Sequence, residues 1–136
     1  KALAVANHNK NALGVADKVT LLKSDWFEAV NGQFDLILSN PPYIALDEWD
    51  DLDFEVRTFD PRLALTDEAD GLSAYRTLTQ HAGLHLKTDG HVMVEIGHTQ
   101  GSAVQALFNS AGFIQIKCLL DMAGRDRDVK GVWSTQ

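Results

Sequence analysis

Apolar and polar residues alternate along the chain in blocks that predict an α/β fold. Five apolar runs rich in β-branched and aromatic residues predict strands over residues 18–23, 34–39, 91–96, 113–120 and 129–135. Glycine stops and apolar positions at helical spacing predict helices over residues 1–13, 72–86 and 100–110. Such alternation is typical of a doubly wound, mostly parallel sheet. No helix separates the last two strands, so the final strand is expected to run antiparallel.

Residues 45–66 show no regular spacing of apolar positions, and the first half of this segment is acidic. A connection of this length inside a compact domain is usually functional or mobile. A solvated loop with a helical turn near residues 51–57 fits the pattern equally well. The segment is therefore a candidate docking surface for a protein, with a plain excursion as the alternative.

The tetrapeptide Asn40-Pro41-Pro42-Tyr43 follows the strand predicted over residues 34–39. Proline fixes φ at about −65° and has no N–H, so the chain leaves this strand stiff. The carbonyls of Asn40 and Pro41 then need not pair within a sheet, and buried carbonyls require donors. These oxygens and the Asn40 side chain suit a planar –NH2 group, with the Tyr43 ring lying against it. Such acceptors favour localised charge on an attacking nitrogen, which stabilises a transition state.

The same tetrapeptide is also a common way to open a loop after a strand. Its residues alone favour a catalytic site and a plain turn about equally. Its position favours the site, because open α/β sheets bind ligands at the carboxyl ends of their strands. We therefore expect Asn40 and Pro41 to be catalytic, and Asn40, Pro41, Pro42 and Tyr43 to bind the substrate.

Two further strand ends carry candidate residues. Asp25 and Trp26 could bracket an adenine, one by accepting from its amino group and the other by stacking. Taken alone, the pair fits better a carboxylate that caps the next turn and a half-buried tryptophan. Glu95 could be a general base, but a rim carboxylate bonded to a neighbouring loop is the favoured interpretation.

Composition and charge narrow the classes of function. The 136 residues are one domain's worth of chain, 45% hydrophobic, with no apolar run long enough for a membrane span and no secretory signal. The single cysteine, Cys118, is interpreted as a buried strand thiol, and the lack of a disulfide pair favours a reducing, cytoplasmic compartment. A net charge of −7 favours a basic protein partner over direct binding of nucleic acid. His81 and His85 have a metal-ligand spacing without a third ligand nearby, so no metal site is expected.

On these residues the chain resembles the class I S-adenosylmethionine-dependent methyltransferases. More narrowly, it resembles the protein-(glutamine-N5) methyltransferases of peptide-chain release factors, the HemK/PrmC family. The Asn-Pro-Pro-Tyr block alone is shared with N6-adenine DNA methyltransferases, whereas the blocks at residues 61–65 and 123–127 make the resemblance specific to the glutamine enzymes. The matching stretches cover nearly the whole chain: residues 24–27, 34–44, 56–57, 61–65, 70–72, 75–76, 95–97, 100–101 and 121–127.

The resemblance implies a Rossmann-like sheet, S-adenosylmethionine as cofactor, and the Gly-Gly-Gln glutamine of release factors as substrate, hence a role in translation termination. It implies that Asn40 and the Pro41 carbonyl hold the glutamine amide, while Pro42 and Tyr43 shape its slot. The implied cofactor contacts are Asp25 and Trp26 near the adenine and Asn40 near the methionine end. Transfer would be a direct displacement at the sulfonium methyl without a metal, so positioning carries most of the catalysis.

The chain also departs from the family pattern. Members have a glycine-rich loop after their first strand, an acidic residue after the second and a small helical N-terminal domain, and this sequence shows none of these. We therefore expect residues 1–136 to be the C-terminal portion of a single methyltransferase domain, with the N-terminal strands of its sheet absent. Such a fragment would be inactive alone, and its exposed sheet edge could self-associate. Two alternatives stay open: methylation of an exocyclic base amine in DNA or rRNA, and a non-catalytic protein-binding fragment.

Overall fold

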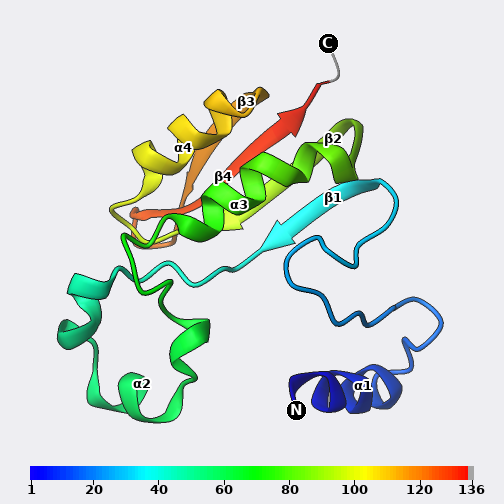
Figure 1. The fold of residues 1–136 in the computed structure, drawn as a ribbon, viewed down its shortest axis with the longest axis horizontal. Helices are drawn as coiled ribbons and strands as arrows, with labels where there is room; N and C mark the ends of the chain where they lie inside the picture. Colours follow the sequence, from blue (N-terminus) through cyan, green and yellow to red (C-terminus); the bar gives the residue numbers. More distant parts are fainter. Residues whose placement is uncertain (135–136) are drawn as a thin grey trace. The chain divides into compact units, whose positions relative to one another are not determined.

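The computed structural model describes residues 1–134. The chain divides into two compact units, Lys1–Asn31 and Gly32–Gln136, each with its own local structure (Figure 1). Whether the two make up one domain, as the sequence suggests, stays a prediction.

The first unit contains helix α1 (Ala2–Ala12), which is followed by irregular chain. The helix stops at the predicted place, before Gly14, whose φ of +66° lies in the left-handed region that suits glycine. The strand predicted over residues 18–23 is wrong, because these residues form no strand. A strand requires a hydrogen-bonded neighbour. Here the Val19 N–H donates instead to the Val15 carbonyl (3.1 Å), and the Val19 carbonyl accepts from the Lys10 ammonium (3.4 Å).

The second unit is built on a four-stranded sheet. Its strands are β1 (Phe34–Ser39), β2 (Leu86–Glu95), β3 (Phe113–Leu120) and β4 (Asp126–Trp133). They are ordered β1-β2-β4-β3, with β1 parallel to β2 and β4 antiparallel to both β2 and β3 (Figure 1). Three strands therefore run in one direction and the final strand in the other. The predicted α/β fold, mostly parallel with an antiparallel last strand, is confirmed.

The bounds of β2 and β4 differ from the predicted ranges. β2 begins at Leu86 because the turn predicted at Asp89-Gly90 lies inside the strand: Phe34 pairs with Leu86, and the next paired position joins Leu36 to His91. The positive φ of Asp89 (+61°) marks this irregularity in the ladder. β4 begins at Asp126, earlier than predicted, and Thr135 at its predicted end lies outside the described residues.

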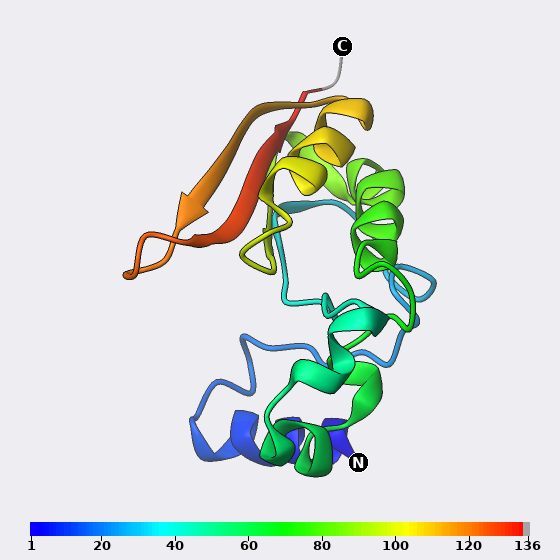
Figure 2. The ribbon, with the colours of Figure 1, turned by 90° about the vertical axis from the view of Figure 1, so that its left-hand side faces the viewer.

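Helices α3 (Ser73–His81) and α4 (Gly101–Ser110) lie side by side on one face of the sheet (Figure 2). A 3-10 turn at Ala82–His85 extends α3, so the helix predicted over residues 72–86 is confirmed in this composite form. The core forms between these helices and the strands because each presents its apolar side to the other. Fully buried side chains in it are Tyr75, Leu86, Val92, Val94, Ile96, Val104, Phe108 and Val129.

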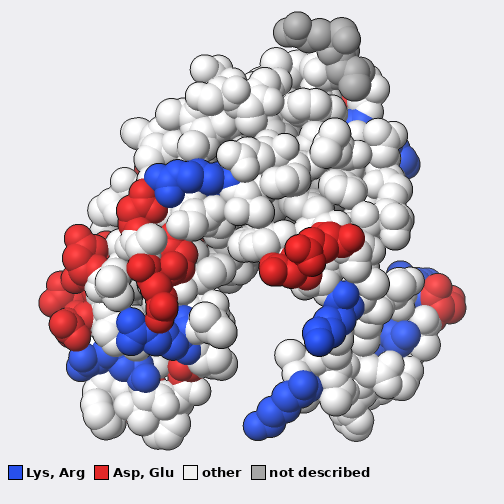
Figure 3. Space-filling model, viewed as in Figure 1, with Lys and Arg blue, Asp and Glu red and all other residues white. Residues whose placement is uncertain are grey.

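Between β1 and α3 the chain forms a lobe of short helices rather than a structureless loop. They are η1 (Leu46–Asp51), α2 (Phe54–Phe59) and η2 (Arg62–Ala64), which includes the helical turn expected near residues 51–57. The lobe closes on itself at its base, where Ile44 pairs with Thr66 and the Ile44 N–H donates to the Leu65 carbonyl (2.9 Å). Acidic and basic side chains gather on this lobe (Figure 3). The lobe therefore remains a candidate docking surface, and it is locally ordered.

β1 is an edge strand of the sheet, and two of its apolar side chains, Leu36 (51% exposed) and Leu38 (66%), are largely uncovered. Self-association through this edge stays a prediction. None of the helices in residues 1–134 has the length and apolar character needed to cross a membrane.

Candidate functional site

Strand β1 delivers the Asn-Pro-Pro-Tyr tetrapeptide to the carboxyl edge of the sheet. The β1–β2 ladder reaches Ser39, which pairs with Val94, and the tetrapeptide follows directly. Asn40 is exposed, Pro41 is buried, and Pro42 and Tyr43 are half-buried. The tetrapeptide thus lies where ligands bind in open α/β sheets.

Asn40 is exposed and Pro41 is buried, and both carry polar groups without a hydrogen-bond partner in residues 1–134. Within residues 1–134 no group hydrogen-bonds to the Asn40 side chain or donates to the Pro41 carbonyl. Buried carbonyls rarely stay unpaired. The Pro41 carbonyl is therefore a natural acceptor for an N–H from a bound molecule, and the exposed Asn40 amide is a second one. Their catalytic and binding roles remain predictions.

Tyr43 is held through its hydroxyl. The hydroxyl donates to Glu95 Oε1 (3.1 Å), and the same oxygen lies 3.5 Å from an Arg127 guanidinium nitrogen. Arg127 also pairs with Asp121 (3.6 Å). Burial, and then the hydrogen bond to Glu95, raise the pKa of Tyr43, so the phenol stays protonated and remains a donor. The interpretation of Glu95 as a rim carboxylate bonded to a neighbouring loop is confirmed.

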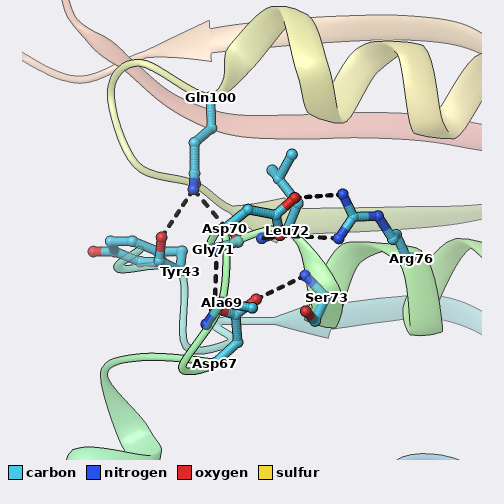
Figure 4. Close-up of polar contacts among 9 residues, drawn as sticks. All are labelled: Tyr43, Asp67, Ala69, Asp70, Gly71, Leu72, Ser73, Arg76 and Gln100. Carbon is cyan, nitrogen blue, oxygen red and sulfur yellow. Dashed lines mark hydrogen bonds and ion pairs between the residues drawn. The ribbon is translucent and has the colours of Figure 1, made fainter. Parts of the chain in front are cut away.

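A second junction holds the Tyr43 backbone (Figure 4). Gln100 Nε2 donates to the Tyr43 carbonyl (2.8 Å) and to the Gly71 carbonyl (3.3 Å). Gly71 has a φ of +74°, and a Cβ added there would lie 2.5 Å from the Tyr43 oxygen. Only glycine permits this approach, so the β1 exit and the turn before α3 are in direct backbone contact.

Two carboxylates fix that turn (Figure 4). Asp67 accepts the N–H groups of Ala69 (2.9 Å), Gly71 (3.0 Å) and Ser73 (2.9 Å). Burial acts to raise the pKa of Asp67, but these bonds to its charged form outweigh burial, and the pKa is lowered. Asp70 forms a two-pronged ion pair with Arg76, and this pair lowers the pKa of Asp70 to about 2.

A cleft of about 350 Å³ opens beside Tyr43, whereas Asn40, Pro41 and Pro42 are not among its lining residues. The lobe contributes Leu52 and the carboxylates of Glu48 and Asp51 to its walls, and Gln100 and Arg127 line it as well. Its walls therefore combine apolar surface with carboxylate, amide and guanidinium groups. The cleft can therefore accept a segment of a polar partner next to Tyr43.

Asp25 and Trp26 belong to the first unit. The turn there is capped by Ser24, whose Oγ accepts from the Ala29 N–H (2.9 Å), so the alternative in which Asp25 caps it is wrong. The Asp25 side chain is exposed, and Trp26 is 40% exposed at a φ of +45°. A hollow of about 430 Å³ is lined by Ser24, Asp25 and Glu28 among others. Because Asn40 lies in the second unit, the expected closeness of Asp25 and Trp26 to Asn40 stays a prediction.

Two residues at the site were not singled out by chemistry in the sequence. Gln100 and Arg127 were noted only as parts of matching stretches, yet they hold the Tyr43 carbonyl and Glu95 respectively. Position is the available signal: Gln100 lies in the connection between β2 and α4, and Arg127 lies at the start of the antiparallel strand β4, which is the same edge of the sheet as Asn40. Cys118, on β3, is only partly buried, and burial followed by the nearby Asp126 raises the pKa of its thiol.

Comparison with known proteins supports first the fold and then the relationship to known sequences. No model of a known protein family matches the chain. A methyltransferase structure from Pyrococcus furiosus matches 78% of this chain and 44% of its own, with a TM-score of 0.51 at 16% identity. That likeness places the fold among methyltransferase folds.

Curated relatives of the chain are release factor glutamine methyltransferases. The release factor glutamine methyltransferase of Cereibacter sphaeroides is 52% identical over 126 residues, which are 93% of this chain and 45% of the relative. That of Caulobacter vibrioides is 44% identical over 133 residues, or 97% of this chain and 46% of the relative. The chain is therefore a homologue of the release factor glutamine methyltransferases, as the resemblance predicted. It spans about half the length of these curated relatives.

Proposed function

We propose that the protein carrying this chain transfers a methyl group from S-adenosylmethionine to a glutamine side-chain nitrogen of peptide-chain release factors. The target is the glutamine of their Gly-Gly-Gln sequence, and the place of action is the cytoplasm. The observation that carries the proposal is the exposed Asn40 amide at the carboxyl end of a parallel strand, with no hydrogen-bond partner in residues 1–134. The 52% identity to a release factor glutamine methyltransferase supports this choice of substrate.

Asn40 and Pro41 would act on the attacking nitrogen. The glutamine amide donates one N–H to the Asn40 side-chain oxygen and the other to the Pro41 carbonyl. An amide nitrogen is a weak nucleophile because its lone pair is delocalised into the carbonyl. Two acceptors on its N–H bonds stabilise the positive charge that develops as nitrogen attacks, and so they bind the transition state better than the substrate. The nitrogen gains the methyl carbon and releases one proton.

Tyr43 and Pro42 would shape the slot for the carboxamide. Pro42 fixes the backbone between Pro41 and Tyr43, and the hydrogen bond from the Tyr43 hydroxyl to Glu95 keeps the Tyr43 ring in place. The cleft beside Tyr43 leaves space for the residues that flank the glutamine. A rigid slot of this kind lowers the barrier by holding the nitrogen in a near-attack position.

Asp25 and Trp26 carry groups that suit the adenine end of the cofactor. An exposed carboxylate at Asp25, with no side-chain partner in residues 1–134, can accept from an adenine amino group, and the exposed Trp26 ring can stack on it. Asn40 would lie near the methionine end. When bound, S-adenosylmethionine supplies a methyl group activated by its sulfonium sulfur, and the electron pair of the broken carbon–sulfur bond stays on the sulfur.

The proposal is tested by methyl transfer from labelled S-adenosylmethionine to three acceptors: a release factor, duplex DNA and rRNA. Label on the release factor is expected. Label on nucleic acid instead would show that the exocyclic-amine alternative holds. A calorimetric titration of residues 1–136 alone with S-adenosylmethionine tests the view that this segment lacks part of the cofactor site, and tight binding by the segment would contradict that view.

A further inference from the structure

The side chain of Gln100 joins three chain segments at the edge of the candidate site (Figure 4). Its Nε2 donates to the carbonyls of Tyr43 and Gly71, and its Oε1 accepts from the Gly97 N–H (3.0 Å). The Tyr75 hydroxyl lies 3.4 Å from the same Oε1. A carboxamide offers two donors and one acceptor oxygen. Both donors and the acceptor of Gln100 are therefore used within the protein.

The bond from Gln100 to Tyr43 controls more than Tyr43. Asn40 is followed by two prolines, whose fixed φ angles make residues 40–43 a stiff unit. A bond that holds the Tyr43 carbonyl therefore also sets the direction in which Asn40 and Pro41 point. The Asn40 side chain has no bond of its own to any part of residues 1–134. Its placement depends on its backbone, which the β1–β2 ladder holds up to Ser39 and the Gln100 side chain holds at Tyr43.

We propose that Gln100 is a positioning residue for the methyl transfer, which orients Asn40 and Pro41 by holding the Tyr43 carbonyl. This inference rests on the proposed function. The role requires a donor at the Nε2 position. A carboxylate of the same shape would place an oxygen against the carbonyl oxygens of Tyr43 and Gly71, and the repulsion would displace the stiff unit. A protonated carboxyl would restore one donor and keep an acceptor.

The test compares Q100E with Q105E in the protein that carries this chain. Gln105 is a matched control, because it is half-buried like Gln100 but lies within α4, where its Nε2 donates to the Gly101 carbonyl of the same helix (3.3 Å). The kcat and KM for a release factor are measured from pH 5.5 to 8.5 and divided by the wild-type values. For Q100E we expect kcat to fall about 10- to 100-fold at pH 8, with little change in KM, because a small misplacement of reacting groups costs this much.

The pH dependence separates positioning from a general loss of structure. The pKa of the introduced carboxyl is expected to lie above its ordinary value of about 4.3, because it faces two carbonyl oxygens in a half-buried place. The kcat ratio of Q100E should therefore recover toward the acid end, while the ratio of Q105E stays flat and near one. Calorimetry should show wild-type affinity of Q100E for S-adenosylmethionine.

Each other outcome counts against one specific statement. A wild-type protein that methylates no release factor refutes the proposed function. An active wild type together with a Q100E kcat equal to it at every pH refutes the positioning role. A loss in Q100E that is constant with pH and comes with a lower Tm also refutes it, because Gln100 then serves folding alone. If Q100E does not fold, Q100A replaces it: a lower kcat with intact cofactor binding supports the role, and an unchanged kcat contradicts it.

Discussion

Replacing Gly71 by alanine tests the contact between the β1 exit and the turn before α3. Gly71 has a φ of +74°, and an added Cβ would meet the Tyr43 carbonyl oxygen at 2.5 Å and Gln100 Nε2 at 2.8 Å. Gly124 provides a control with nearly the same backbone, since its φ is +79° and nothing lies within 4 Å of an added Cβ. The two substitutions therefore share the backbone strain and differ in the contact.

The magnitudes follow from these two contributions. Placing an L-residue in the left-handed region costs about 1–2 kcal/mol, so G124A should lower the free energy of unfolding by this amount. Forcing an atom into a packed site adds about 1–3 kcal/mol. We therefore expect G71A to lose about 2–5 kcal/mol in total. The displaced atom is the Tyr43 carbonyl, so G71A should also lower kcat for methyl transfer, whereas G124A should not.

Urea unfolding followed by circular dichroism measures both free energies, and equal m-values would confirm that the two transitions are comparable. For a unit of about 100 residues each kcal/mol corresponds to roughly 4–8 °C in Tm, so thermal melts give an independent check. Equal losses in G71A and G124A would refute the reasoning, because the contact with Tyr43 would then contribute nothing.

Two further predictions concern a tyrosine pair and an acid transition. Y75F removes the hydroxyl of a fully buried residue, which donates to the Glu95 carbonyl (2.9 Å), and should lower the free energy of unfolding by about 1–2 kcal/mol. Y43F removes a half-buried hydrogen bond to Glu95, so it should lower the free energy of unfolding less and kcat more than Y75F does. The reverse order in thermal melts and methyl-transfer assays of the two variants would contradict this assignment. The pKa of Asp67 is lowered in the folded state, so the folded state binds a proton at this carboxylate less readily than the unfolded chain does. The contribution of Asp67 to stability is therefore present above about pH 4 and is lost as pH falls through the folded-state pKa. D67N should flatten the acid arm of the stability curve, and D47N, at an exposed carboxylate, should leave it unchanged.

Much of the sheet was predictable from local pattern. β3 was predicted at its observed ends because Gly112 and Asp121 bound a mainly apolar run, in which Gln115 and Lys117 alternate with apolar residues. The strand predicted over residues 18–23 failed because strand formation depends on a neighbour, which local composition does not report. β2 was predicted too short because a turn signal at Asp89-Gly90 lies within the strand as an irregularity.

The candidate site was predictable in part, because its central motif is local in the sequence. Asn40 and its neighbours form a contiguous motif after a strand, so their place at the edge of the sheet follows from the sequence. The hold on Tyr43 does not, because it joins Gly71 and Gln100, which are distant in sequence and meet only in the fold. Relations of this kind require the three-dimensional arrangement.

The central claim is that Asn40 holds the nitrogen that receives the methyl group. The most direct measurement is labelled methyl transfer to a release factor by wild type, N40A and the exposed control N109A, with mass spectrometry locating the methyl group. The account predicts label on the Gly-Gly-Gln glutamine nitrogen, a loss of about 10²- to 10³-fold in kcat for N40A, and full activity in N109A. Full activity in N40A, or a methyl group on another residue of the release factor, would contradict it.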